Sequence, residues 1–144
     1  MTKAEILAMT DVDLRIKAGV LAGWHLHVVR EYEGRPHSRG WNRSAEDRDP
    51  ETFVDLPDYP NDIGAAMTDL FESVYGRGGK IKGGAWVLST VDGGRDVASA
   101  TLLWKAQSGQ KHRANKVTVV CPRGEMAKAI TLAWVCAMLG VSDV

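Results

Sequence analysis

Three strand-like segments joined by very short turns constrain the fold of this chain more than any other feature. Residues 85–91, 97–106 and 116–120 are predicted strands, and the second places alanine or a large apolar residue at every other position. The Asp-Gly-Gly run at 92–94 is a strong tight-turn signal, and Ser-Gly at 108–109 predicts a second turn. Because parallel neighbours need long crossover connections, these strands must be antiparallel.

Before the three strands, apolar residues recur at the spacing of an α-helix. A helix is predicted from about Asp11 to Ala22, with Thr10 as a good N-cap, and a shorter helical turn is predicted over Lys3 to Met9. After Asn61, apolar residues recur at helical spacing and form one continuous stripe, namely Ile63, Ala66, Met67, Leu70, Phe71 and Val74. This spacing predicts a helix that Asn61 caps and that stops before Gly76.

The last apolar segment is also predicted to be a helix. Pro122 is expected at its first position and Gly140 just after its end. Its residues are apolar almost all round, so it should be buried on more than one side. Cys136 lies in this run and is expected to be a buried small hydrophobe, reduced like Cys121.

Two further segments complete the expected architecture. Residues 24–32 favour a strand because they are rich in β-branched and aromatic side chains. Residues 34–60 contain four prolines and no periodicity, which is typical of a functional or disordered loop. We therefore expect a single α+β domain over residues 1–144 with the order α-β-α-β-β-β-α. It would have a four-stranded, mostly antiparallel sheet covered by helices.

Composition excludes several classes of protein. Among 144 residues, 18 Lys and Arg balance 18 Asp and Glu, and this zero net charge argues against binding to bulk nucleic acid. No apolar run approaches the roughly 20 residues that span a bilayer, and the first residues lack the apolar core of a secretory signal. With only two cysteines, these features favour a cytoplasmic protein.

Four short motifs, spread over roughly residues 10 to 140, resemble those of a known family. They are Gly23-Trp24 after the first long helix, Tyr59-Pro60-Asn61-Asp62-Ile63-Gly64-Ala65-Ala66, a strand tryptophan at Trp86 or Trp104, and Pro122 before an Ala-rich last helix. In these motifs the chain resembles the phage ABA-sandwich family of small phage and prophage proteins. The resemblance implies an α-β-α sandwich acting in the cytoplasm of an infected bacterial host. Most members of that family have no assigned activity.

Three features invite a catalytic or metal-binding interpretation, and each lacks a required part. The Gly-rich segment 76–84 departs from the phosphate-binding Walker A pattern and joins a helix to a strand, which is the wrong order. His25 and His27 share a strand face, but zinc needs three or four ligands. Cys121 would gain thiolate character at a helix N-terminus, but no phosphatase arginine follows it. We expect no enzymatic activity, no metal and no cofactor.

Basic residues gather at places that suit an anion. Arginine binds phosphate through paired hydrogen bonds, tryptophan offers a stacking face for a base, and a helix N-terminus favours anions. The predicted ligand-binding residues lie in the long loop, in the turn before residue 116 and at the start of the last helix. They are Arg39, Trp41, Arg43, Lys111, Arg113 and Arg123.

These residues lead to one leading hypothesis of function. The chain is expected to be a non-enzymatic binding protein for a small phosphorylated ligand. With the family resemblance, it would be a counter-defence protein that sequesters a nucleotide second messenger. Two alternatives stay open: an interaction or assembly module that forms an oligomer through its apolar helices, and a small nucleotide hydrolase using Cys121 or the His25/His27 pair. Basic clusters of this kind are also often plain solvated surface.

Overall fold

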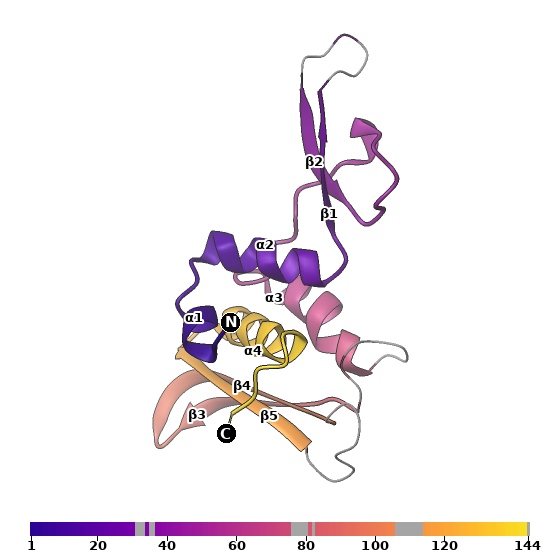
Figure 1. The fold of residues 1–144 in the computed structure, drawn as a ribbon. Helices are drawn as coiled ribbons and strands as arrows, with labels where there is room; N and C mark the ends of the chain where they lie inside the picture. The colour runs from indigo at the N-terminus through magenta and orange to yellow at the C-terminus, as the bar shows by residue number, and fades with distance from the viewer. Residues whose placement is uncertain (31–33, 35–36, 76–80, 82, 106–113, 144) are drawn as a thin grey trace.

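The computed structural model describes residues 1–30, 34, 37–75, 81, 83–105 and 114–143. These residues form an α+β body from which a β-hairpin projects (Figure 1). The helices are α1 (Lys3–Leu7), α2 (Asp11–Leu21), α3 (Ile63–Ala65) and α4 (Met126–Met138), with shorter or tighter turns η1 (Pro50–Thr52), η2 (Ala66–Phe71) and η3 (Glu72–Tyr75). The strands are β1 (His25–Val29), β2 (Ser38–Asn42), β3 (Ala85–Asp92), β4 (Arg95–Lys105) and β5 (Ala114–Pro122).

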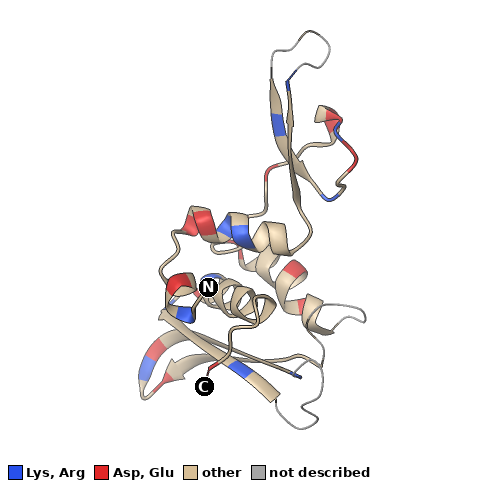
Figure 2. Cartoon of the chain, viewed as in Figure 1, with Lys and Arg blue, Asp and Glu red and all other residues tan. Residues whose placement is uncertain are grey.

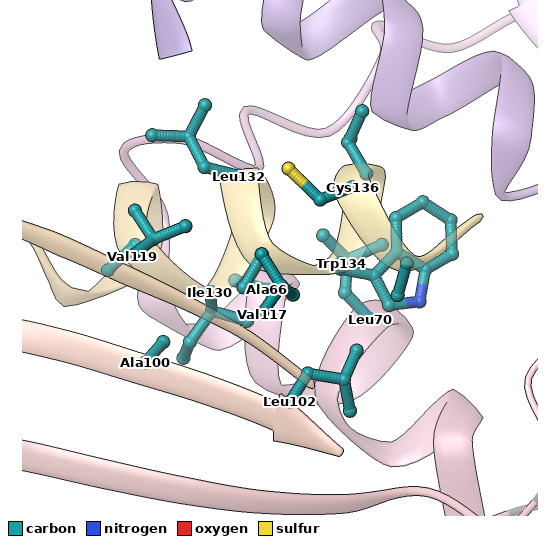
Figure 3. Packing of buried hydrophobic residues seen from close by; sticks show 14 of the residues in the cluster. Ala66, Leu70, Ala100, Leu102, Val117, Val119, Ile130, Leu132, Trp134 and Cys136 are labelled. Carbon is teal, nitrogen blue, oxygen red and sulfur yellow. The ribbon is translucent and has the colours of Figure 1, made fainter. Parts of the chain in front are cut away.

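The three strands β3, β4 and β5 form one antiparallel sheet in chain order, as their short connections predict. On one face, Leu102 lies opposite Trp86 and Val117 in register, and α4 packs against this face (Figure 3). On the other face Val87 and Val120 are about half exposed. The helices α2, α3 and α4 therefore lie on the same side of the sheet (Figure 1).

The expected four-stranded sheet is not found in the described part of the chain. The strand β1 pairs with β2 in a separate two-stranded sheet, with His27 opposite Gly40 and Leu26 opposite Trp41. The strand β2 lies inside the segment that was expected to be an irregular loop. Its sequence, SRGWN, holds one strong strand former, Trp41, and its stability comes from pairing with β1 and from a bridge to Val54. Tertiary pairing of this kind leaves no periodic signal in the sequence.

The segment that follows Asn61 is helical, as its apolar stripe predicts, and Ala66, Leu70 and Val74 of that stripe are buried. Its cap is Asp62 rather than Asn61, since the Asp62 side chain accepts from the amide of Ala65. After one α-helical turn the backbone widens into a π-helix in η2 and then tightens in η3. Single π-helical turns are frequent at functional sites.

The last helix is buried as expected, because nearly every side chain from Ala129 to Ala137 is enclosed. Its start differs from the prediction. Pro122 is the last residue of β5, where it lies opposite Val97, and α4 begins four residues later at Met126. Gly140 follows the helix with a positive φ of 72°, which suits the predicted glycine stop.

Candidate functional site

The first candidate site is a cavity between the end of α2, the helical segment 63–75 and the C-terminal half of α4. It encloses about 580 Å³, within the range of small-molecule sites. Its apolar lining is Leu21, Ala22, Ile81, Trp134 and Met138. Its polar lining is Arg43, Thr68, Asp69, Glu72 and Ser73. The cavity thus combines an apolar interior with two carboxylates, two hydroxyls and one guanidinium.

Four side chains beside this cavity form a connected polar cluster, which we call the Asp69 cluster: Trp24, Arg43, Tyr59 and Asp69. The indole N–H of Trp24 donates to the Tyr59 hydroxyl at 2.9 Å, and that hydroxyl donates to Asp69 Oδ2 at 2.6 Å. Arg43 Nη2 lies 2.9 Å from the same Oδ2, and its guanidinium carbon lies 4.8 Å from the centroid of the Trp24 ring. One carboxylate therefore holds a buried phenol and an exposed cation together.

Tyr59 is the buried centre of the Asp69 cluster, with none of its surface exposed. Burial and the hydrogen bond to the Asp69 carboxylate raise the pKa of the Tyr59 hydroxyl well above its ordinary value. Tyr59 therefore stays protonated at physiological pH and acts as a hydrogen-bond donor that orients Asp69. On the neighbouring wall, the indole N–H of Trp134 donates to the Ser73 hydroxyl at 3.0 Å.

The second candidate site lies on the hairpin, and we call it the hairpin groove. It is an open hollow of about 600 Å³ lined by Arg39, Gly40, Trp41, Phe53, Val54 and Asp55. Phe53 fits there because Gly40 has no side chain, and a Cβ at residue 40 would collide with it. The Phe53 ring also stacks on His27, with centroids 5.5 Å apart. Backbone hydrogen bonds join Trp41 to Val54, and both residues line the groove.

The structure distributes the predicted ligand-binding residues over separate places. Arg39 and Trp41 line the hairpin groove together, whereas Arg43 lies at the first cavity, tied to Asp69. Arg123 lies in the turn before α4, 3.6 Å from Asp96, at a third hollow. Lys111 and Arg113 lie outside the described residues. In Figure 2, basic and acidic positions are interspersed over the described chain rather than gathered by sign.

The cysteines lie in environments that disfavour thiolate chemistry. Cys121 lies on β5, not at a helix N-terminus, and burial together with the nearby Glu125 raises the pKa of its thiol. Cys136 is fully buried in α4, as expected, and burial raises the pKa of its thiol to about 11. Neither thiol is activated by its surroundings.

The two strand histidines are in different environments. The His27 ring is buried and its Nε2 lies 2.8 Å from both Asn42 Oδ1 and the Ser44 carbonyl, while His25 is exposed. His27 therefore has a structural role at the base of the hairpin. Within the residues that the structure describes, no group of three or more His, Cys, Asp or Glu side chains is placed to hold a metal ion.

Sequence reasoning missed the residues that build the first cavity. In sequence, Asp69 and Glu72 are typical of the solvated face of an amphipathic helix, but in the structure Asp69 accepts from Tyr59 and pairs with Arg43. In sequence, Trp24 and Tyr59 stand out only as parts of the Gly23-Trp24 motif and the motif at residues 59–66. The occurrence of both motifs in one chain is the sequence signal that could have paired these residues, which a direct hydrogen bond joins in the structure.

None of the helices in the described part of the chain combines the length and apolar character that crossing a bilayer requires. Comparisons of the chain with protein-family models, with curated proteins and with solved structures gave no match.

Proposed function

We propose that this chain is a binding protein for a small phosphorylated ligand of nucleotide type, held in the hairpin groove and not converted. The observation that supports this best is that Arg39 and Trp41 line one hollow together with Phe53. A guanidinium matches the geometry of a phosphate, and the partly exposed Trp41 ring offers a stacking face for a base. Asp55 lines the same groove, and its carboxylate is an acceptor of the kind that binds ribose hydroxyls.

The biological setting of this proposal comes from the resemblance to the phage ABA-sandwich family. The ligand would be a nucleotide second messenger made by a bacterial defence system, and the chain would sequester it in the host cytoplasm. Sequestration needs affinity and slow release rather than chemistry, so a binding groove is sufficient for it.

Calorimetry against cyclic dinucleotides, cyclic oligonucleotides and ADP-ribose derivatives tests the proposal. We expect one ligand class to bind at micromolar or lower concentration. Arg39→Ala should weaken binding about tenfold or more, since a charge-assisted hydrogen bond is lost. Trp41→Ala should weaken it about as much, and Trp41→Phe should retain most of the affinity. Arg95→Ala, at the exposed start of β4, is the matched control.

Recovery of the bound ligand separates storage from catalysis. Heat denaturation of the complex should release the ligand intact, whereas an altered product would indicate a hydrolase. Absence of binding across the whole panel would contradict the proposed function.

A second candidate function is self-association. On α2, Val12, Ile16 and Val20 form an outward stripe, each 43% exposed or more, and Leu26 and Val28 of β1 are 40% and 48% exposed. Helix α4, the most apolar helix by sequence, is buried within the chain and so offers no surface for self-association. Both apolar surfaces belong to one chain, so a twofold axis that places the hairpin of one copy on α2 of the other would bury both at once.

Sedimentation velocity tests self-association. Ile16→Asp should convert a dimer to a monomer, while Val87→Asp, on the outer face of the sheet, should leave the dimer intact. A monomeric parent protein at tens of micromolar would contradict this second function.

A further inference from the structure

The cavity beside the Asp69 cluster has the chemistry of a cation site, which the phosphate-binding proposal does not use. Its polar rim carries two carboxylates, Asp69 and Glu72, three residues apart on one helical segment, and the hydroxyls of Thr68 and Ser73. All four groups accept hydrogen bonds. The single basic residue among its described lining, Arg43, is already paired with Asp69.

The contacts of Arg43 indicate that this polar rim suits a cation. Its guanidinium lies on the face of Trp24 and 2.9 Å from Asp69, an arrangement in which a cation is held by an aromatic face and a carboxylate together. Arg43 is the residue directly after β2, and its side chain, which is 53% exposed, reaches the cavity. A group held at the surface by two contacts can leave when a competing cation arrives.

The carboxylate does not depend on Arg43 for its orientation. The Tyr59 hydroxyl donates to Asp69 at 2.6 Å, and it accepts a hydrogen bond from the indole N–H of Trp24. Burial and this hydrogen bond keep the Tyr59 phenol protonated, so it remains a donor to Asp69. The acceptor side of the site is therefore preorganised before a ligand binds.

The apolar lining of the cavity determines which uncharged part of a ligand would fit. Behind the rim lie Leu21, Ile81, Trp134 and Met138, and the indole N–H of Trp134 is already used by Ser73. An apolar wall with no spare donor favours an alkyl or aryl group. The volume of about 580 Å³ suits a small molecule.

We infer that this cavity binds a small organic cation, an amine or guanidine with an alkyl or aryl body, and that Arg43 occupies the cation position as an internal competitor. The ligand's charged group would displace Arg43 from Asp69 and Trp24, and its apolar body would lie against Trp134 and Met138. The inference is independent of the hairpin groove.

Calorimetry with three probes of matched shape tests the inference: phenethylamine, the neutral phenethyl alcohol and the anionic phenylacetate. The amine should bind and the other two should bind at least about tenfold more weakly. Arg43→Gln should tighten amine binding about tenfold, as expected if Arg43 fills the site for about nine-tenths of the time. Arg95→Gln, the same change on an exposed strand start, should leave amine binding unchanged.

Two acidic variants complete the test. Asp69→Asn should abolish amine binding, and because that variant also disturbs Tyr59, Glu72→Gln provides a second one on an exposed side chain. Glu72→Gln should weaken the amine and leave the neutral probe unaffected. Equal affinity for amine and alcohol, or weaker amine binding in Arg43→Gln, would overturn the inference whatever the hairpin groove binds.

Discussion

Trp24 and Tyr59 are joined by a 2.9 Å hydrogen bond from the indole N–H to the phenol oxygen. One residue follows α2 and the other precedes α3, so this bond ties the base of the hairpin to the helical segment that lines the first cavity. The Tyr59 hydroxyl in turn donates to Asp69, and Asp69 forms an ion pair with Arg43. The Gly23-Trp24 segment and the segment 59–66 thus meet in the fold.

Replacing Tyr59 by phenylalanine tests the importance of this connection. The substitution removes the acceptor of the Trp24 N–H and one of the two donors to Asp69 Oδ2, the other being Arg43. Because a hydrogen bond to a charged group is lost at a fully buried side chain, it should destabilise the chain by about 1–3 kcal/mol. The free energy of unfolding in urea measures this effect. Tyr75→Phe removes a hydroxyl from a side chain that is 57% exposed and loses one long hydrogen bond, 3.3 Å from the Trp86 amide, so it should cost less than about 1 kcal/mol. Equal stability of Tyr59→Phe and the parent would show that the cluster contributes nothing.

The Asp143 carboxylate should make the free energy of unfolding depend on pH in the acidic range. Burial raises the pKa of Asp143, but hydrogen bonds from Lys3 and the Thr118 amide, with the charges of Lys3 and Lys116, outweigh it, so its pKa lies below the ordinary 3.8. Stabilisation from Asp143 is therefore complete above pH 3.8 and is lost as pH falls through the lowered folded-state value.

Asp143→Asn should lower the free energy of unfolding at pH 7 by up to about 1 kcal/mol, the range of a partly exposed ion pair. The difference from the parent should shrink below pH 3.8. Urea denaturation over a pH series gives both results, and Glu46→Gln, an exposed change in a loop, is the control. A constant difference at all pH values would mean that the carboxylate charge is irrelevant.

Both thiols should resist alkylation in the folded protein. Burial raises the pKa of Cys136 to about 11, and burial with Glu125 raises that of Cys121. Iodoacetamide at pH 8 should therefore modify neither cysteine within the time that labels the urea-unfolded chain completely. Mass spectrometry counts the modified sites. Rapid labelling of native Cys121 would contradict this and revive a cysteine-based hydrolase.

Sequence patterns predicted the body of the fold because that part is governed by local rules. The spacing of Ala66, Leu70 and Val74 predicts a buried helical face, and the Asp-Gly-Gly turn at 92–94 predicts an antiparallel strand pair. The antiparallel β3–β4–β5 sheet and the buried α4 followed from the same reasoning. These features depend on neighbours in sequence, which periodicity can detect.

The hairpin and the first cavity depend instead on residues far apart in the chain. Strand β2 is held by cross-strand pairing and by Phe53 against Gly40, and neither contact has a local signature. Asp69 looks like any polar residue on an amphipathic helix until Tyr59 and Arg43 are placed beside it. Grouping basic residues by sequence also failed to show that Arg39 and Arg43 lie at different cavities.

The indole N–H signals of the five tryptophans provide the most direct test of the proposed function. Each tryptophan gives one resonance in a proton–nitrogen correlation spectrum, and Trp41 alone among them lines the hairpin groove, whereas Trp134 lines the first cavity. Titration with the bound nucleotide should shift the Trp41 signal and leave Trp24 and Trp134 in place. A nucleotide that shifts Trp134 and not Trp41, or a full panel that shifts neither, would contradict the account.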